Sequence, residues 1–177
     1  MLDWHWPMSL SAPPIISHLG ISRHFRGRNE YKSWDTWCLH LFDYYGELRI
    51  NQQVFPIRPG FVSITPVNLS FTHVWFADNS RHITVHFQPP ALETGIELFP
   101  TMKDLGPDFD EFWADMVGAI SWYSTNKRRS EARLWDVLFR LSVPPTDKRT
   151  GENRMHPALQ AALQKIEVGL SGPISIT

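Results

Sequence analysis

Three polar and three apolar residues alternate near the middle of the chain, in the run His82-Ile83-Thr84-Val85-His86-Phe87. Successive side chains of a β-strand point to opposite faces, so this run predicts a strand with one polar and one apolar face. We expect the three apolar side chains to pack against other elements. His82, Thr84 and His86 would then form either a hydrogen-bonding wall for a small ligand or a solvated face, and we favour the wall.

Other side chains of the same region can complete a ligand site. A tryptophan ring can stack on the apolar face of a sugar, although core packing is the commoner role of any single tryptophan. Arg49 alternates with Leu48 and Ile50, so it either binds a carboxylate or hydroxyl pair or lies exposed to solvent. The predicted effector site consists of Trp37, Arg49, His73, Trp75, His82, Thr84 and His86.

The elements that must hold these residues are short apolar runs separated by turn residues. The runs cover residues 37–45, 47–51, 54–57, 61–65, 71–76 and 82–87. Gly46, the pair Pro59-Gly60 and the cluster 77–80 separate them, and Arg58-Pro59-Gly60-Phe61 is typical of a type II turn. Short strands with such frequent turns predict an antiparallel barrel or sandwich. Residues 27–33 are polar, and we expect a loop there.

After residue 108 the hydrophobic period changes from 2 to 3.6. One helical face carries Phe109, Phe112, Trp113, Met116, Val117 and Ile120, and a second carries Leu134, Val137, Leu138 and Leu141. The short link between them predicts an antiparallel helix pair. Because apolar residues lie on more than one face of the second helix, we predict that Leu134, Leu138 and Leu141 contact a second copy in a two-fold dimer.

Composition and charge exclude several functions. Of the 177 residues, 42% are hydrophobic and 20% are charged, which is typical of a globular domain. A net charge of −1 provides no positive field for nucleic acid, and no apolar run is long enough to cross a membrane. Cys38 is the single cysteine, and the first ten residues lack the features of a signal peptide, so we expect a cytoplasmic protein.

Three segments resemble the AraC/XylS family of bacterial transcription regulators. They are residues 45–50 (YGELRI), 57–66 (IRPGFVSITP) and 81–87 (RHITVHF), and Phe61 stands where the family usually has an acidic residue. The helix pair occupies the place of the family's dimerisation region. Residues 156–177 are similar to the opening helix of its DNA-binding domain.

The resemblance implies a mainly β fold, a cupin-like antiparallel barrel (double-stranded β-helix) followed by an antiparallel helix pair. The expected division is an N-terminal arm and effector-binding barrel (1–92), dimerisation helices (93–143), a linker (144–155) and the start of a helix-turn-helix domain (156–177). The implied protein is not an enzyme. It is a homodimer without cofactor that binds a small effector such as a sugar and contacts DNA only through a C-terminal domain, most of which would follow residue 177.

A metal-dependent cupin enzyme, an isomerase or oxygenase, is the alternative. Cupin enzymes hold their metal with a His-x-His pair, a nearby Glu and a later His. This sequence contains no His-x-His, and Phe71 stands where the later histidine belongs. His73, His82 and His86 could form a divergent site, but a catalytic metal needs three ligands in a defined geometry. We therefore predict no metal site.

Overall fold

A computed structural model describes residues 4–33, 35–92 and 94–143. The elements are β1 (His5–Ser9), β2 (Ile15–His24), β3 (Gly27–Ser33), β4 (Trp37–Asp43), β5 (Gly46–Ile50), β6 (Gln53–Ile57), β7 (Phe61–Thr65), β8 (Leu69–Trp75), β9 (Ser80–Gln88), β10 (Ile96–Pro100), β11 (Met102–Asp104), the 3₁₀ turn η1 (Gly106–Asp108), α1 (Phe109–Trp122) and α2 (Lys127–Leu141). The predicted linker and the predicted start of the DNA-binding domain lie outside the described residues.

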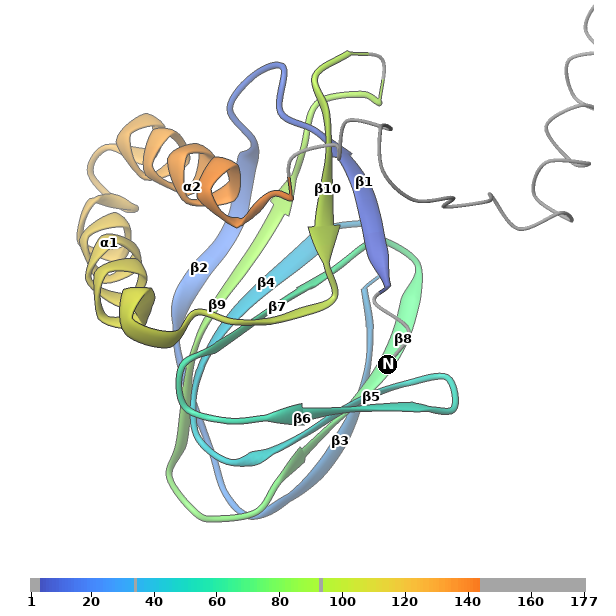
Figure 1. The fold of residues 1–177 in the computed structure, drawn as a ribbon. Coiled ribbons are helices and arrows are strands. Elements are labelled where there is room, and N and C mark those ends of the chain that lie inside the picture. The colour runs from blue at the N-terminus through green and yellow to red at the C-terminus, as the bar shows by residue number, and fades with distance from the viewer. Residues whose placement is uncertain (1–3, 34, 93, 144–177) are drawn as a thin grey trace, which may run out of the picture. The chain divides into compact units, whose positions relative to one another are not determined.

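Two antiparallel sheets form the barrel (Figure 1). One sheet has the strand order β11-β7-β4-β9-β2, and the other has the order β3-β8-β5-β6. Strands β1 and β10 form a separate two-stranded ribbon. The predicted fold class, a mainly β cupin-like barrel followed by two helices, is confirmed.

The sequence pattern located the central strands and missed the edge strands. The predicted runs from residue 37 to residue 87 correspond to β4 to β9, with bounds that differ by a few residues. The segment predicted as a loop is strand β3, which pairs with β8 from Gly27↔Trp75 to Ser33↔Leu69. All but the last residue of β3 are exposed, because it is an edge strand, so it lacks an apolar alternation. Strands β10 and β11 continue the β structure beyond the predicted barrel end at residue 92.

Strand β9 separates the interior of the barrel from the helices. Ile83, Val85 and Phe87 are fully buried in a core that they share with residues of α1 and α2. His82 and Thr84 are also buried, on the opposite face of the strand. The predicted orientation of the two sets of side chains is therefore confirmed. Both faces of β9 are therefore covered, one by the helices and the other by the opposite sheet of the barrel.

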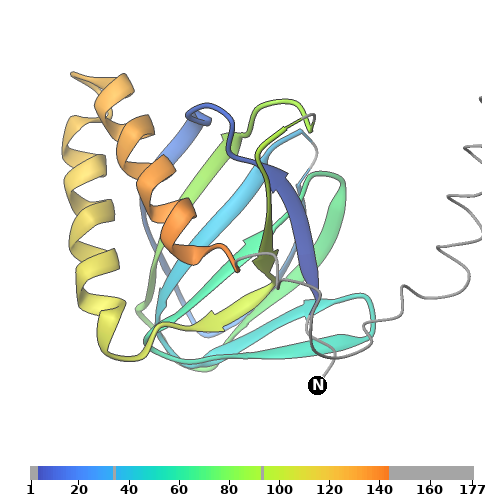
Figure 2. The same cartoon turned by 45° about the horizontal axis from the view of Figure 1, so that its top comes forward.

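Helices α1 and α2 lie side by side over the outer face of the five-stranded sheet (Figure 2). The Ser130 hydroxyl of α2 donates a hydrogen bond to the Ala119 carbonyl of α1 over 2.7 Å, and the Asn126 side chain caps α2. Neither described helix combines the length and the apolar character needed to cross a membrane.

The second helix does not present its leucines to a partner. Leu134, Leu138 and Leu141 are at most 1% exposed and belong to the core beneath the helix pair. The prediction that these three side chains form a dimer contact is therefore wrong for this conformation. The physical reason is that the five-stranded sheet supplies a wide apolar face, and the main stripe of the helix is used to cover it.

Candidate ligand-binding cavity

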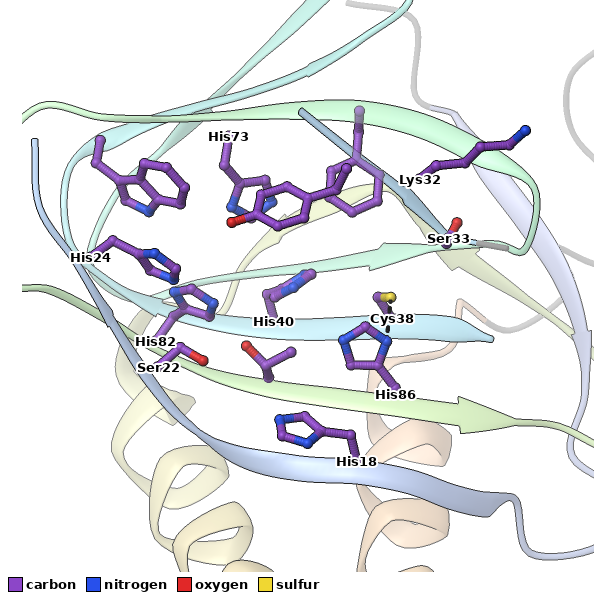
Figure 3. A pocket seen from close by; sticks show the side chains of 14 residues that line it. His18, Ser22, His24, Lys32, Ser33, Cys38, His40, His73, His82 and His86 are labelled. Carbon is purple, nitrogen blue, oxygen red and sulfur yellow. Dashed lines mark hydrogen bonds between the residues drawn. The ribbon is translucent and has the colours of Figure 1, made fainter. Parts of the chain in front are cut away.

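A cavity of about 200 Å³ lies between the two sheets of the barrel (Figure 3). Its lining comes from β2 (His18, Ser22, His24), β3 (Tyr31, Lys32, Ser33), β4 (Cys38, His40), β8 (Phe71, His73, Trp75) and β9 (His82, Thr84, His86). Strands β2 and β3 are edge strands of different sheets. The cavity therefore lies beside a seam at which no backbone ladder closes the barrel.

Strand register brings the polar residues together. In the antiparallel pair of β4 and β9, His40 lies opposite Thr84 and Cys38 lies opposite His86. Residues opposite each other on neighbouring strands share a face of the sheet, so these four side chains form one surface. Strand β8 adds His73 from the other sheet, because it pairs with β5 and β3 rather than with β9.

Histidine rings pack against each other in the cavity. The ring centroid of His40 lies 5.0 Å from that of His73 and 5.3 Å from that of His82. At the end of β2, the His24 ring is stacked between Trp75, at 4.2 Å, and His82, at 5.0 Å. Figure 3 shows the rings of His24, His40, His73 and His82 pointing into the same space from both sheets.

Burial keeps these histidines uncharged. Loss of hydration lowers the pKa of His73 to about 3, and the charge of His24 adds to the effect. The pKa of His82 is also lowered to about 3, mainly by burial and further by His73 and His24. Burial and the neighbouring histidines hold the pKa of His40 well below 6.5. A neutral imidazole offers one donor and one acceptor.

Several polar atoms of the cavity have no partner within the protein. His40 Nδ1, His73 Nε2, His82 Nδ1 and Thr84 Oγ1 are buried without a hydrogen bond. The other ring nitrogen of His73 lies 3.4 Å from the Tyr44 hydroxyl. Buried polar groups in folded proteins are nearly always paired, with water among the partners, so these four atoms can bond to water or to a small molecule in the cavity.

Five of the seven predicted effector residues line the cavity, and two do not. Trp37 belongs to β4, on which Cys38 and His40 face the cavity, so Trp37 is one position out of phase and packs against the helix-covered core. Arg49 is exposed on the outside of the barrel, where its Nε donates to Glu47 Oε2 over 2.8 Å. Trp37 therefore lies on the opposite face of β4 from the cavity, since a shift of one residue reverses the face of a strand, and Arg49 has the exposed position that the sequence left open.

The sequence analysis missed several lining residues. His40 was detectable, since Cys38, His40 and Phe42 alternate with Leu39 and Leu41 along β4. Tyr31 was not detectable, because β3 was predicted to be a loop. His18 and His24 come from β2, which lies before the first predicted strand run.

Cys38 does not have the properties of a catalytic nucleophile. Its Sγ lies 3.4 Å from His86 Nδ1, which is the geometry of a weak thiol–imidazole contact. Burial raises the pKa of the Cys38 thiol to about 11. The thiol therefore stays protonated at neutral pH, and the reactive thiolate is scarce. In the part of the chain that the structure describes, no group of three His, Cys, Asp or Glu residues is arranged to hold a metal ion.

Comparison with known proteins gives matches in structure but not in sequence. No family model and no curated protein sequence matches the chain. The AraC-like transcriptional activator CuxR is 13% identical, with a TM-score of 0.50, over 89% of this chain and 62% of CuxR. A predicted oxalate decarboxylase from Thermotoga maritima is 14% identical, with a TM-score of 0.39, over 42% of this chain and 68% of the decarboxylase.

ToxT from Vibrio cholerae O395, solved with (E)-4-(8-methylnaphthalen-1-yl)but-3-enoic acid, is 9% identical to this chain. Its TM-score is 0.47, over 88% of this chain and 76% of ToxT. The similarity to CuxR shows a shared fold, and the chain spans less than two thirds of the length of CuxR. The fold is therefore of a kind found in an AraC-like transcriptional activator.

Proposed function

We propose that this domain senses a small molecule in the cytoplasm and controls DNA binding by a C-terminal domain of an AraC-like transcription regulator. The observation that carries the proposal is the cavity with unpartnered atoms of His40, His73, His82 and Thr84. Each unsatisfied buried polar group costs roughly 1–3 kcal/mol. A ligand that supplies hydrogen bonds to these atoms recovers part of that cost, and a hydroxyl-rich molecule such as a sugar has the required groups.

The fold connects the cavity to the helices through two strands. Strand β9 carries cavity residues on one face and the core residues Ile83 and Val85 on the other. Strand β2 lines the cavity and also meets α2, since the Ile16 amide donates to Glu131 Oε1 over 3.2 Å. A ligand that prefers one position of these strands would shift the helices, by no more than its difference in affinity for the two states.

A homodimer through the helical layer is part of this proposal. Because the three leucines of α2 are buried, the contact would use exposed apolar side chains of the helices, such as Val117 and Phe139. We expect sedimentation at micromolar concentration to show a dimer that Phe139→Glu converts to monomer. A wild-type monomer under these conditions would contradict the dimer and leave ligand sensing in place.

Replacing one hydroxyl tests the cavity as a binding site. Thr84→Val removes the unpartnered Oγ1 and keeps the shape of the side chain, so we expect a ligand that bonds to Thr84 to bind about tenfold more weakly. The matched control is Thr65→Val, since Thr65 is equally buried in β7 but does not line the cavity. A thermal-shift screen over sugars, small acids and amides finds the ligand, and calorimetry measures both variants.

Experiments on the purified wild-type protein and these two variants also distinguish a ligand sensor from a metal-dependent enzyme. Ligand-induced stabilisation that Thr84→Val weakens and Thr65→Val does not is the expected outcome. No stabilisation by any compound, together with a cavity that takes up no probe, would argue against a sensor. Stoichiometric iron, manganese or zinc in the purified protein would favour the metal-dependent enzyme instead.

A further inference from the structure

The cavity has two chemically different walls. The five-stranded sheet contributes hydrogen-bonding groups, including His40 and Thr84. The four-stranded sheet contributes the carbocyclic rings of Tyr31, Phe71 and Trp75, together with the polar side chains of Lys32, Ser33 and His73. The Tyr31 and Phe71 rings are stacked at 5.8 Å, and Phe71 and Trp75 are both buried. A molecule that fills this space lies with an apolar face on the rings and with a polar edge toward β4 and β9.

The charged groups are not placed to neutralise a ligand. Among the described residues that line the cavity there is no Asp or Glu. Lys32 is the one Lys or Arg in that lining, and its side chain extends away from the histidines (Figure 3). Arg49, which could have bound a carboxylate, lies outside the barrel with Glu47. The described lining therefore holds no carboxylate for a cation, and its one ammonium group, that of Lys32, points away from the histidines.

His73 and His82 do not supply a positive charge. With its pKa lowered to about 3, only about one His73 ring in ten thousand is protonated at neutral pH. The same holds for His82. These rings act as neutral donors and acceptors, so a charged ligand would lose its hydration without gaining a counter-charge. Burial of an unpaired charge is strongly unfavourable, whereas burial of a hydrogen-bonded neutral group is not.

On the basis of the proposed sensing function, we infer that the effector is an uncharged molecule with a flat apolar face and a hydrogen-bonding edge. Its size is bounded by the cavity of about 200 Å³. Its apolar face lies on the aromatic wall, and its polar edge accepts from and donates to the imidazoles and to Thr84. Flat uncharged amides and similar ring compounds belong to this class. Carboxylic acids and amines that are ionised at neutral pH do not, and neither do puckered rings such as sugars, so this inference narrows the proposed effector class.

Four probes test this inference. Benzamide, benzoate and benzamidine have nearly the same shape and differ in the charge of their polar group, and cyclohexanecarboxamide keeps the amide of benzamide on a puckered ring. Calorimetry near neutral pH is expected to show that benzamide binds at least about tenfold more tightly than each of the other three. Thr84→Val should weaken benzamide binding, and Thr65→Val should leave it unchanged.

The outcomes distinguish this inference from the function on which it rests. Tighter binding of benzoate or benzamidine at a site sensitive to Thr84→Val overturns the uncharged class and leaves the sensor intact. Equal binding of cyclohexanecarboxamide overturns the requirement for a flat face. If none of the four compounds binds, the inference that the effector is a flat, uncharged molecule of this kind is overturned. The thermal-shift screen then shows whether the proposed sensing function fails as well.

Discussion

Acidification from about pH 7 to about pH 5 is expected to lower the free energy of unfolding of this domain by several kcal/mol. The cause is the set of buried histidines, above all His40, His73 and His82, whose pKa values lie below the ordinary value of 6.5. In the unfolded chain these rings are hydrated and take up protons below pH 6.5. In the folded domain His73 and His82 stay neutral until the pH approaches about 3.

The sign follows from proton linkage. Between about pH 6.5 and pH 3 the unfolded state binds more protons than the folded state, so the stability is complete above pH 6.5 and decreases as the pH falls. Each such histidine changes the free energy of unfolding by about 1.4 kcal/mol per pH unit. Three of them together give up to about 4 kcal/mol per unit, against a total of roughly 5–15 kcal/mol for a typical domain. Unfolding near pH 5 or slightly below is therefore expected.

Urea unfolding at several pH values between about 5 and 7 measures this effect. Carboxylates titrate mainly below this range, since Asp has an ordinary pKa of about 3.9. His73→Gln should reduce the slope of stability against pH by about one proton, with His82→Gln as a second variant if the first does not fold. His18→Gln is the control, because His18 lies exposed at the rim. A stability that stays flat down to pH 5 would contradict the burial of neutral histidines.

Gly46→Ala is expected to destabilise the domain by about 3 kcal/mol or more. Gly46 begins β5 and pairs with Trp75 of β8 and Ile57 of β6. A β-carbon added there would lie 2.2 Å from the Val74 carbonyl oxygen and 2.9 Å from the Tyr44 ring. Because the nearest atom belongs to the backbone of a central strand, the clash is relieved only if β5 moves away from β8.

The matched control is Gly118→Ala in α1. The nearest atom to its added β-carbon is in the Trp122 side chain at 3.9 Å, an ordinary contact. Alanine is favoured over glycine inside a helix by up to about 1 kcal/mol, so this variant should be neutral or slightly more stable. Urea unfolding of both variants provides the comparison, and an equal effect at the two positions would refute the role assigned to Gly46.

Gly46 also shows what a sequence pattern can and cannot predict. Its place between two apolar runs predicted a break between two strands, and β4 and β5 are separate strands that belong to different sheets. The need for glycine has a different cause, because it comes from the close approach of Val74, which lies 28 positions along the chain. The Pro59-Gly60 turn was predictable in full, since Gly60 has a φ of +96° and the Phe61 amide donates to the Arg58 carbonyl over 3.1 Å.

The candidate site was predictable where alternation was clear. On β9 the period of two placed His82 and Thr84 inside and Val85 outside, as the structure shows. On β4 the strand was recognised, but Trp37 was chosen although His40 points into the cavity. The residue types Trp and His do not indicate which face of β4 each side chain occupies. That depends on which face of the strand packs against the helices.

The local features of this protein could be predicted from residue order: the central strands, the two helices, the turns and the two faces of β9. These follow from hydrophobic period and turn chemistry, which act over a few residues. Three features became evident only in the folded domain: β3 is a strand, Leu134 belongs to the core, and histidines from four strands meet in one cavity. Pairing partners and burial depend on contacts between distant segments, and no local pattern along the chain encodes them.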